Sequence, residues 1–372
     1  MFRRLFNVRL RAQIVKELLS ILRDPRSRLV LIGPPLIQLL VFSFAATLEV
    51  NHVDLAVYNR DTGRASYELL AEIGAAGFVN RVYAVHSPAQ RRALIDREQV
   101  IAALDIPPDF SRNVAAGHTA TAQVILDGRR ANAAQITLGY LDRIAARTGA
   151  ELVPDSPGAR DPTVVRHWFN PNLIYRWYIV PSLSGILSTI IALIVTALSI
   201  ARERELGTFD QLMVSPTTPF EIIVAKTVPA VLIGTVLGLV MIGAAVFVFG
   251  VPFRGSFGLL LPSLVLLILS MVGIGLMISA ISSTQQQAIL GAFAVAVPMV
   301  VMSGFATPVD NMPRVLQWVA ECLPLTHFLV IVQGCFVKAL PPGVVWGQAW
   351  PMAAVAVVTL GIAHVVVRSR LG

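Results

Sequence analysis

The chain has 372 residues, of which 55% are hydrophobic and 14% are charged. Soluble domains carry about 25% charged residues, and a mean hydropathy of +0.69 leaves too little charge to cover a water-facing surface. The composition therefore excludes an ordinary soluble enzyme and favours a membrane protein with several spans. The 2 cysteines exclude a disulfide scaffold and argue against a cysteine-rich metal site.

The first 28 residues are basic, and their apolar residues recur every four positions: Phe2, Phe6, Leu10, Ile14, Leu18 and Leu22. This spacing predicts an amphipathic helix over residues 1–28 that lies at the membrane interface, with a packed cytoplasmic helix as the alternative. Residues 29–48 contain no charged residue and predict the first transmembrane helix. A cleaved signal peptide is disfavoured, because this apolar run and the segment before it are both long for one.

Residues 49–172 are predicted to form the one domain outside the membrane. Strands are expected at Val53–Tyr58, Val79–Val85, Val100–Ile106 and Ala122–Leu126, alternating with helices at Arg64–Gly74, Pro88–Asp96, Phe110–Ala115 and Ala131–Arg147. This alternation predicts a small α/β domain with a mixed sheet. Its histidines and aspartates show no metal-ligand spacing and no nucleophile motif, so a docking or gating module is favoured over an enzyme.

Residues 173–372 are predicted to hold five more transmembrane helices, at 174–200, 222–249, 259–282, 288–305 and 344–367. The expected fold class is therefore an α-helical polytopic membrane protein with six transmembrane helices and an inserted α/β extracytoplasmic domain. Arginines and lysines near the N-terminus predict that this end stays in the cytoplasm, and six spans return the C-terminus to the same side. The net charge of +8 then reflects topology, and no nucleic-acid partner is expected.

Residues 306–343 are apolar but interrupted by five prolines, which predicts short re-entrant or interfacial helices on the outer side. Glu321 is an acid in this apolar setting, which makes it a candidate for the translocation path. The alternative is a carboxylate that reaches the interface or bonds its own helix. Cys322 and Cys335 lie in the same segment, and the sequence leaves open whether they pair or remain free thiols.

Uncharged polar residues in the spans are further candidates for lining a translocation path: Gln38, Ser182, Thr189 and Thr196. The alternative is that their side chains bond the backbone or a neighbouring helix. No ionisable residue falls near a membrane midplane, which disfavours a proton- or ion-coupled carrier. The chain also has no glycine-rich P-loop, so the energy for pumping would come from another polypeptide.

The loop 201–221 between the second and third predicted spans is the most informative stretch. Its alternating arginines and glutamates suit a short helix, with a solvated charged turn as the alternative. The candidate functional residues in it are Arg202, Glu203, Arg204, Glu205, Gly207, Thr208, Gln211, Leu212, Ser215 and Pro216.

This loop resembles the cytoplasmic signature of ABC-2 type transporter permeases, E-R-E-x-G-T followed by L-x-x-S-P and a later Glu221 and Lys226. The resemblance continues along the chain, in Lys16-Glu17, Asp24-Pro25, Pro34-Pro35, Ile106-Pro107, Asp127-Gly128, Phe169-Asn170-Pro171 and Pro324-Leu325-Thr326-His327. The similarity is greatest to the bacterial drug-export-like branch with a large periplasmic domain after the first span.

The resemblance implies a permease subunit of an ATP-driven exporter in the bacterial inner membrane, moving amphiphilic or hydrophobic small molecules outward. It implies no cofactor in this chain, because a separate ATPase subunit would bind ATP and Mg²⁺ and contact the loop 201–221. The other implied partners are a second permease, identical or a sister chain, and, at family level, a membrane-fusion adaptor and an outer-membrane channel. An ion- or proton-coupled secondary carrier is the alternative. A receptor and a membrane enzyme are disfavoured, because neither an output module nor clustered histidines or aspartates are present.

Overall fold

The computed structural model describes residues 2–23, 25–45, 50, 52–152, 169–170, 174–208 and 217–371. The chain divides into two compact units. Met1–Ala46 and His167–Gly372 form a helical unit, and Thr47–Arg166 form an α/β unit.

The α/β unit has a mixed four-stranded sheet in the order β2-β1-β3-β4. Strands β2 and β3 pair parallel to β1, and β4 pairs antiparallel to β3. The elements are β1 (Val53–Asn59), α3 (Arg64–Ala75), β2 (Val79–Ala84), α4 (Pro88–Asp96), β3 (Ala102–Ile106), α5 (Phe110–Ala115), β4 (Gln123–Leu126) and α6 (Ala131–Leu152). Every strand and helix expected in this stretch is present, with ends that differ by a few residues.

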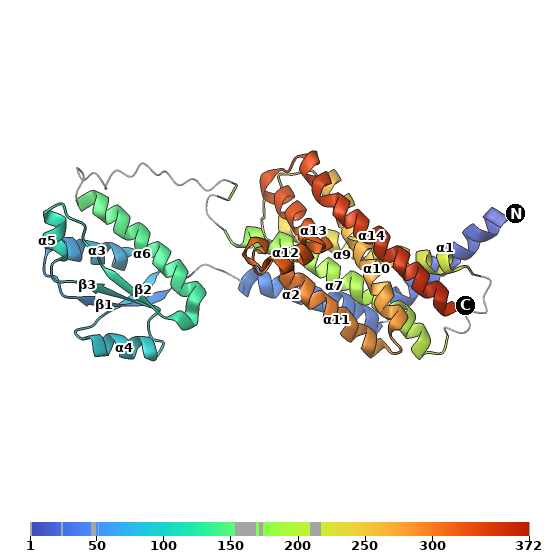
Figure 1. Cartoon of the computed structure of the whole chain (residues 1–372), viewed down its shortest axis with the longest axis horizontal. Coiled ribbons are helices and arrows are strands. Elements are labelled where there is room, and N and C mark those ends of the chain that lie inside the picture. Colours follow the sequence, from blue (N-terminus) through green and yellow to red (C-terminus); the bar gives the residue numbers. More distant parts are fainter. Residues whose placement is uncertain are drawn as a thin grey trace. The chain divides into compact units, whose positions relative to one another are not determined.

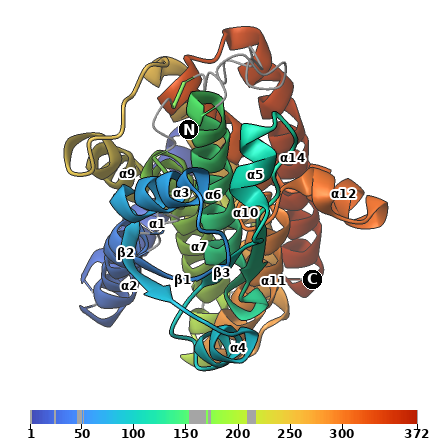
Figure 2. The ribbon, with the colours of Figure 1, turned by 90° about the vertical axis from the view of Figure 1, so that its left-hand side faces the viewer.

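The two faces of the sheet are covered by different helices (Figure 2). Side chains alternate between the faces of a strand, and Leu55 and Val57 of β1 pack with residues of α3 and α6. Ala56 points the other way and packs with Val100 and Leu94 on the side of α4. The result is a three-layer unit whose core is apolar on both sides of the sheet.

Polar residues at the carboxyl ends of β1 and β3 bond one another. Asp105 accepts hydrogen bonds from Arg60 at 3.0 Å and from Arg91 at 2.6 Å. Buried Asp61 accepts from the Ser111 hydroxyl at 2.5 Å and from the Gly63 backbone N–H at 3.0 Å. These aspartates therefore hold the loops after the strands in place.

The stability of this edge should depend on pH through Asp61. Burial alone would raise the pKa of Asp61, but hydrogen bonds from Ser111, Ser66 and Gly63 outweigh it and hold the pKa below its usual range. Because the folded-state pKa is lowered, the ionised carboxylate stabilises the fold above its unfolded pKa of about 3.9. That stabilisation is lost as the pH falls through the folded pKa.

We expect backbone amides around Asp61 to lose protection from hydrogen exchange between about pH 5 and about pH 2. The measurement is hydrogen exchange of the full chain, corrected for the intrinsic pH dependence of exchange. Asp61→Asn should lower protection at about pH 5 and flatten its pH dependence. An unchanged pH dependence in this variant would contradict the role given to Asp61.

The helical unit contains nine α-helices within the described residues: α1 (Phe2–Arg23), α2 (Pro25–Ala45), α7 (Arg176–Glu205), α9 (Pro219–Phe247), α10 (Phe257–Ile281), α11 (Gln285–Met302), α12 (Arg314–Glu321), α13 (Pro324–Gln333) and α14 (Pro342–Leu371). A π-helical turn at Gly334–Lys338 continues α13. The long helices lie side by side, and the N- and C-termini lie at the same end of the unit (Figure 1).

Among the described residues, five helices are long and apolar enough to cross a membrane: α7, α9, α10, α11 and α14. The pair α12 and α13, bent by 76°, makes a sixth if it crosses as one broken span. Helix α2 corresponds to the predicted first span, but its apolar portion, Ile32–Phe44, is shorter than any of these five helices. The bend between α12 and α13 agrees with the broken apolar segment expected at 306–343. The chain is a multi-pass membrane protein.

Small residues bring the helices close around α7, which is largely buried within the unit. A side chain at Gly185 would overlap Phe328 of α13, and one at Gly238 would overlap Ser188 and Leu264. Gly234, four residues before Gly238, faces Ile268 at 3.2 Å from where a Cβ would lie. Glycines at helix contacts let the backbones approach closely in a membrane, where van der Waals packing drives association.

Candidate functional site

Four charged side chains from three helices meet at the C-terminal end of α7. Glu203 accepts hydrogen bonds from Lys16 of α1 at 3.0 Å and from Lys226 of α9 at 3.0 Å. The Lys226 ammonium also lies 3.3 Å from a carboxylate oxygen of Glu17 and 3.3 Å from the Ser199 carbonyl oxygen. We call Lys16, Glu17, Glu203 and Lys226 the ion cluster.

The ion cluster is largely removed from water. The side chain of Lys226 is 2% exposed and that of Glu203 is 11% exposed, whereas Lys16 is half exposed at the rim. A buried charge is tolerated when partners surround it. Here Glu203 contacts two lysines, and Lys226 contacts two carboxylates and a carbonyl oxygen. The ion cluster therefore ties α1 and α9 to the end of α7.

The next two residues of α7 bond the ends of two other helices. The Arg204 guanidinium donates to the carbonyl oxygens of Ala280 at 2.7 Å and Ser282 at 3.2 Å, at the C-terminal end of α10. Glu205 accepts from the backbone N–H of Gln285, the first residue of α11, at 2.7 Å. Both contacts complement the helix dipoles, since a cation lies at a C-terminus and an anion at an N-terminus.

Ser279 adds a contact one turn earlier. Its hydroxyl accepts from the backbone N–H groups of Ile200 at 2.9 Å and Ala201 at 3.1 Å. Together with Arg204, this bond fixes the end of α7 against the end of α10. The last two turns of α7 therefore contact α1, α9, α10 and α11.

Gly207 and Thr208 end α7 in a Schellman motif. Gly207 has φ of +69° and donates its backbone N–H to the Arg204 carbonyl at 3.1 Å. Thr208 donates its backbone N–H to the Glu203 carbonyl at 2.9 Å. Glycine suits this position because it adopts positive φ without steric cost, which accounts for the glycine in the E-R-E-x-G-T signature.

Helix α9 begins after the loop with a capping box. Glu221 accepts the Thr218 backbone N–H at 2.7 Å, and the Thr218 hydroxyl accepts the Glu221 N–H at 3.2 Å. Glu221 is 2% exposed. Its role in the structure is thus to start α9 beside the end of α7.

The structure changes the expected boundaries of the charged segment. Residues 202–205 form the last turn of α7, because arginine and glutamate are good helix formers and extend the helix beyond its apolar part. After α7, the structure describes residues 206–208 of the loop and continues from Thr217. Gln211, Leu212, Ser215 and Pro216 lie outside the described residues. Glu203 faces the protein interior, whereas Glu205, Leu206, Gly207 and Thr208 are exposed.

The candidates for a translocation path fall into two groups. Ser182, Thr189 and Thr196 are fully buried. The hydroxyls of Ser182 and Thr196 donate to the carbonyls of Tyr178 and Ala192, both at 2.6 Å. Gln38, on α2, and Glu321, at the end of α12, are exposed. Cys322 is exposed, Cys335 is buried, and both are free thiols.

Sequence reasoning did not find the ion cluster as a unit. Lys16 and Glu203 are 187 residues apart, and no local spacing links them. Two signals were available: Lys16-Glu17 inside an otherwise arginine-rich helix, and Lys226 near the start of an apolar span. Ser279 and Gln285 carry no signal in the sequence, because their roles depend on the packing of α10 and α11.

Apolar helices packed around α7, with the buried charges of the ion cluster gathered at its end, form a helical membrane protein. The family model described as ABC-2 family transporter protein matches residues 27–365. The probable multidrug ABC transporter permease YbhR of Escherichia coli K12 is 40% identical over 372 residues, covering 100% of both chains. The related permease YbhS is 30% identical over 98% of this chain and 97% of its own length. The inner membrane transport permease YhhJ is 28% identical over 96% of each chain.

The chain therefore belongs to the ABC-2 transporter family. It is the permease subunit of an ABC exporter and not a catalytic enzyme. The predicted family and function are confirmed.

Proposed function

We propose that the end of α7 receives the movement of a separate ABC ATPase and passes it to the other helices. The observation that carries the proposal is the set of contacts from Glu203, Arg204 and Glu205 to α1, α9, α10 and α11. A force applied next to this end would move these helices together, because each is tied to it by a charged hydrogen bond. The ATPase would bind ATP and Mg²⁺, and this chain would hold neither.

The proposed contact with the ATPase is the exposed surface on both sides of residues 209–216. Leu206 is 62% exposed and Phe220 is 57% exposed, one at each edge of that stretch. Large apolar side chains on a water-facing surface are typical anchors of a protein interface. Glu203 would act indirectly in this arrangement, by holding α7 in place.

The proposed topology places both termini and the end of α7 in the cytoplasm of a bacterial inner membrane. It is supported by the basic residues of α1 and by the termini lying at one end of the helical unit (Figure 1). Helix α1 would lie at the cytoplasmic membrane interface, and the α/β unit would lie in the periplasm as an inserted domain. There it would contact a membrane-fusion adaptor and, through it, an outer-membrane channel.

A second permease, identical or a sister chain, completes the proposed transporter. Helices α2 and α11 both pack on α7 and both carry exposed apolar side chains, such as Phe42 and Phe293. Gln38 on the exposed part of α2 would line the path between the two permeases. The cargo is proposed to be amphiphilic or hydrophobic small molecules, in keeping with the multidrug names of YbhR and YbhS.

We expect Leu206→Asp and Phe220→Asp each to reduce the co-purifying ATPase by roughly tenfold, since anchor residues dominate interface energies. The measurement is a pull-down of tagged permease from gently solubilised membranes, with the ATPase quantified per permease. Tyr67→Asp is the matched control, because Tyr67 is 58% exposed but lies on α3 of the α/β unit. Equal ATPase recovery from all three variants would refute this contact surface. Absence of any ATPase from the wild-type sample would favour a secondary carrier.

A further inference from the structure

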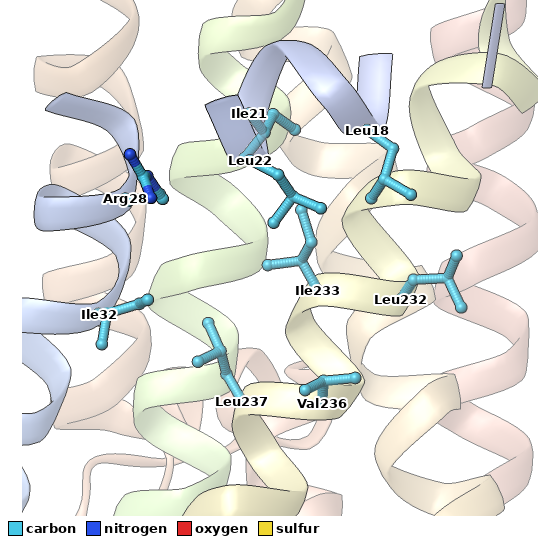
Figure 3. Close-up of a pocket in the computed structure, with 9 residues that line it drawn as sticks. All are labelled: Leu18, Ile21, Leu22, Arg28, Ile32, Leu232, Ile233, Val236 and Leu237. Carbon is cyan, nitrogen blue, oxygen red and sulfur yellow. The ribbon is translucent and has the colours of Figure 1, made fainter. Parts of the chain in front are cut away.

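An apolar groove lies between α1, α2 and α9 (Figure 3). None of the four residues of the ion cluster lines it. Its volume is about 350 Å³, within the range of roughly 300–1,000 Å³ common for ligand pockets. Three helices line it through Leu18, Ile21, Leu22, Arg28, Ile32, Leu232, Ile233, Val236 and Leu237.

Among the described residues that line the groove, Arg28 is the one that carries a charge. It lies on α2, directly before the apolar run that starts at Leu29. Within the described part of the chain, no acidic side chain is paired with Arg28. The groove itself is lined by hydrocarbon, and Arg28, an exposed cation, lies beside it one turn before Ile32 of α2 (Figure 3).

The groove opens on a surface that faces hydrocarbon in a membrane. Val236 and Leu232 of α9 are 57% and 49% exposed, and Ile32 of α2 is 43% exposed. Water gains no hydrogen-bond partner from such a lining, so an apolar chain is the favoured occupant. An occupant that also carries one negative group would satisfy Arg28.

We propose that this groove binds an anionic phospholipid of the surrounding membrane, with an acyl chain along α9 and the phosphate at Arg28. A guanidinium matches a phosphate in geometry and charge, and it keeps its charge at any physiological pH. Basic pockets between helices on the cytoplasmic side of membrane proteins bind anionic head groups in this way. The lipid would fill the corner between α1 and α9, the two helices that the ion cluster joins to α7.

Binding of this kind stabilises the folded protein in proportion to the logarithm of lipid concentration over Kd. The inference goes beyond the proposed ATPase coupling, and it requires only that the helices lie in a bilayer. Its failure would therefore leave the coupling proposal standing, and the reverse also holds.

The first test is native mass spectrometry of full-length protein exchanged into mixed micelles that contain phosphatidylglycerol and phosphatidylcholine in equal amounts. Wild type should retain phosphatidylglycerol roughly fivefold more than phosphatidylcholine, and Arg28→Gln should lose this preference. Arg11→Gln is the matched control, because Arg11 is an exposed arginine of α1 outside the groove. Equal retention of the two lipids by wild type, or an unchanged preference in Arg28→Gln, would overturn the proposal.

The second test needs no variant and locates the acyl chain. Phosphatidylglycerol with a photoreactive group in its acyl chain should label peptides that contain Leu18–Leu22 and Leu232–Leu237 in wild-type protein in vesicles. Labelling spread evenly over the exposed helices would contradict a specific groove. Loss of the label on adding a hydrophobic export cargo, with no effect of the lipid head group, would assign the groove to the cargo instead.

Discussion

Glu203→Gln is expected to destabilise the helical unit by about 3 kcal/mol, the lower end of the cost of breaking a buried ion pair. The variant leaves Lys226 buried beside a neutral amide, whose single oxygen can accept from only one of the two lysines that Glu203 now bonds. Glu17 remains 3.3 Å from Lys226, which limits the loss. Because the ion cluster joins α1 and α9 to α7, we also expect cargo-stimulated ATP hydrolysis by the assembled transporter to fall sharply.

Thermal unfolding of the solubilised permease and cargo-stimulated ATPase of the reconstituted complex measure these two effects. Glu205→Gln, two residues along the same helix, is the matched control for the thermal unfolding measurement. It loses a carboxylate that is exposed and accepts one N–H of α11, so its cost should be about 1 kcal/mol. Similar losses of stability in both variants would show that the burial of Glu203 does not matter.

A double variant separates stability from coupling. Glu203→Gln combined with Lys226→Met removes the charge on both sides of the pair, and replacing a buried pair by apolar groups is often neutral or stabilising. Recovery of stability without recovery of stimulated ATPase would assign the ion cluster to transmission of movement. Recovery of both would reduce the ion cluster to a structural contact, and the coupling proposal would then rest on Arg204 and Glu205 alone.

Local signals were sufficient for most of the fold. The helix predicted at Pro88–Asp96 begins at Pro88 as expected, and the structure adds a cap in which the Ser87 hydroxyl accepts the Gln90 N–H. Pro25 predicts the break between α1 and α2, since proline fits the first turn of a helix. The positions of glycine and proline and the spacing of apolar residues are local properties of the sequence. The ends of these helices depend on such local properties, which is why they could be predicted.

The candidate site was only partly predictable, because its function depends on partners that are distant in sequence. The E-R-E-x-G-T signature identified the right turn, and Gly207 has the positive φ that a helix end requires. The sequence did not show that Glu203 faces inward while Glu205 faces water, because both glutamates belong to one alternating run. That difference arises from Lys226, a cation on another helix that reaches only one of the two.

Gly275→Ala is expected to destabilise the helical unit by about 2 kcal/mol, which is typical of overpacking. A Cβ at Gly275 of α10 would overlap the Thr196 hydroxyl of α7 and lie 3.0 Å from the Leu193 carbonyl oxygen. The hydroxyl has little freedom to move, since it donates to the Ala192 carbonyl at 2.6 Å. Relief would therefore require α7 and α10 to separate, next to the contact between Ser279 and the end of α7.

The matched control is Gly361→Ala on α14. Apart from its chain neighbours and the adjacent backbone of its own helix, no atom lies within 4 Å of a Cβ added there. That substitution should be neutral or stabilise by up to about 1 kcal/mol, because alanine is the better helix former. Opposite signs in thermal unfolding of the two variants are the expected result, and Thr196→Ala should restore part of the loss in Gly275→Ala. If both glycine variants instead stabilise the protein, then α7 and α10 do not pack closely at Thr196, and the end of α7 cannot move α10 through this contact.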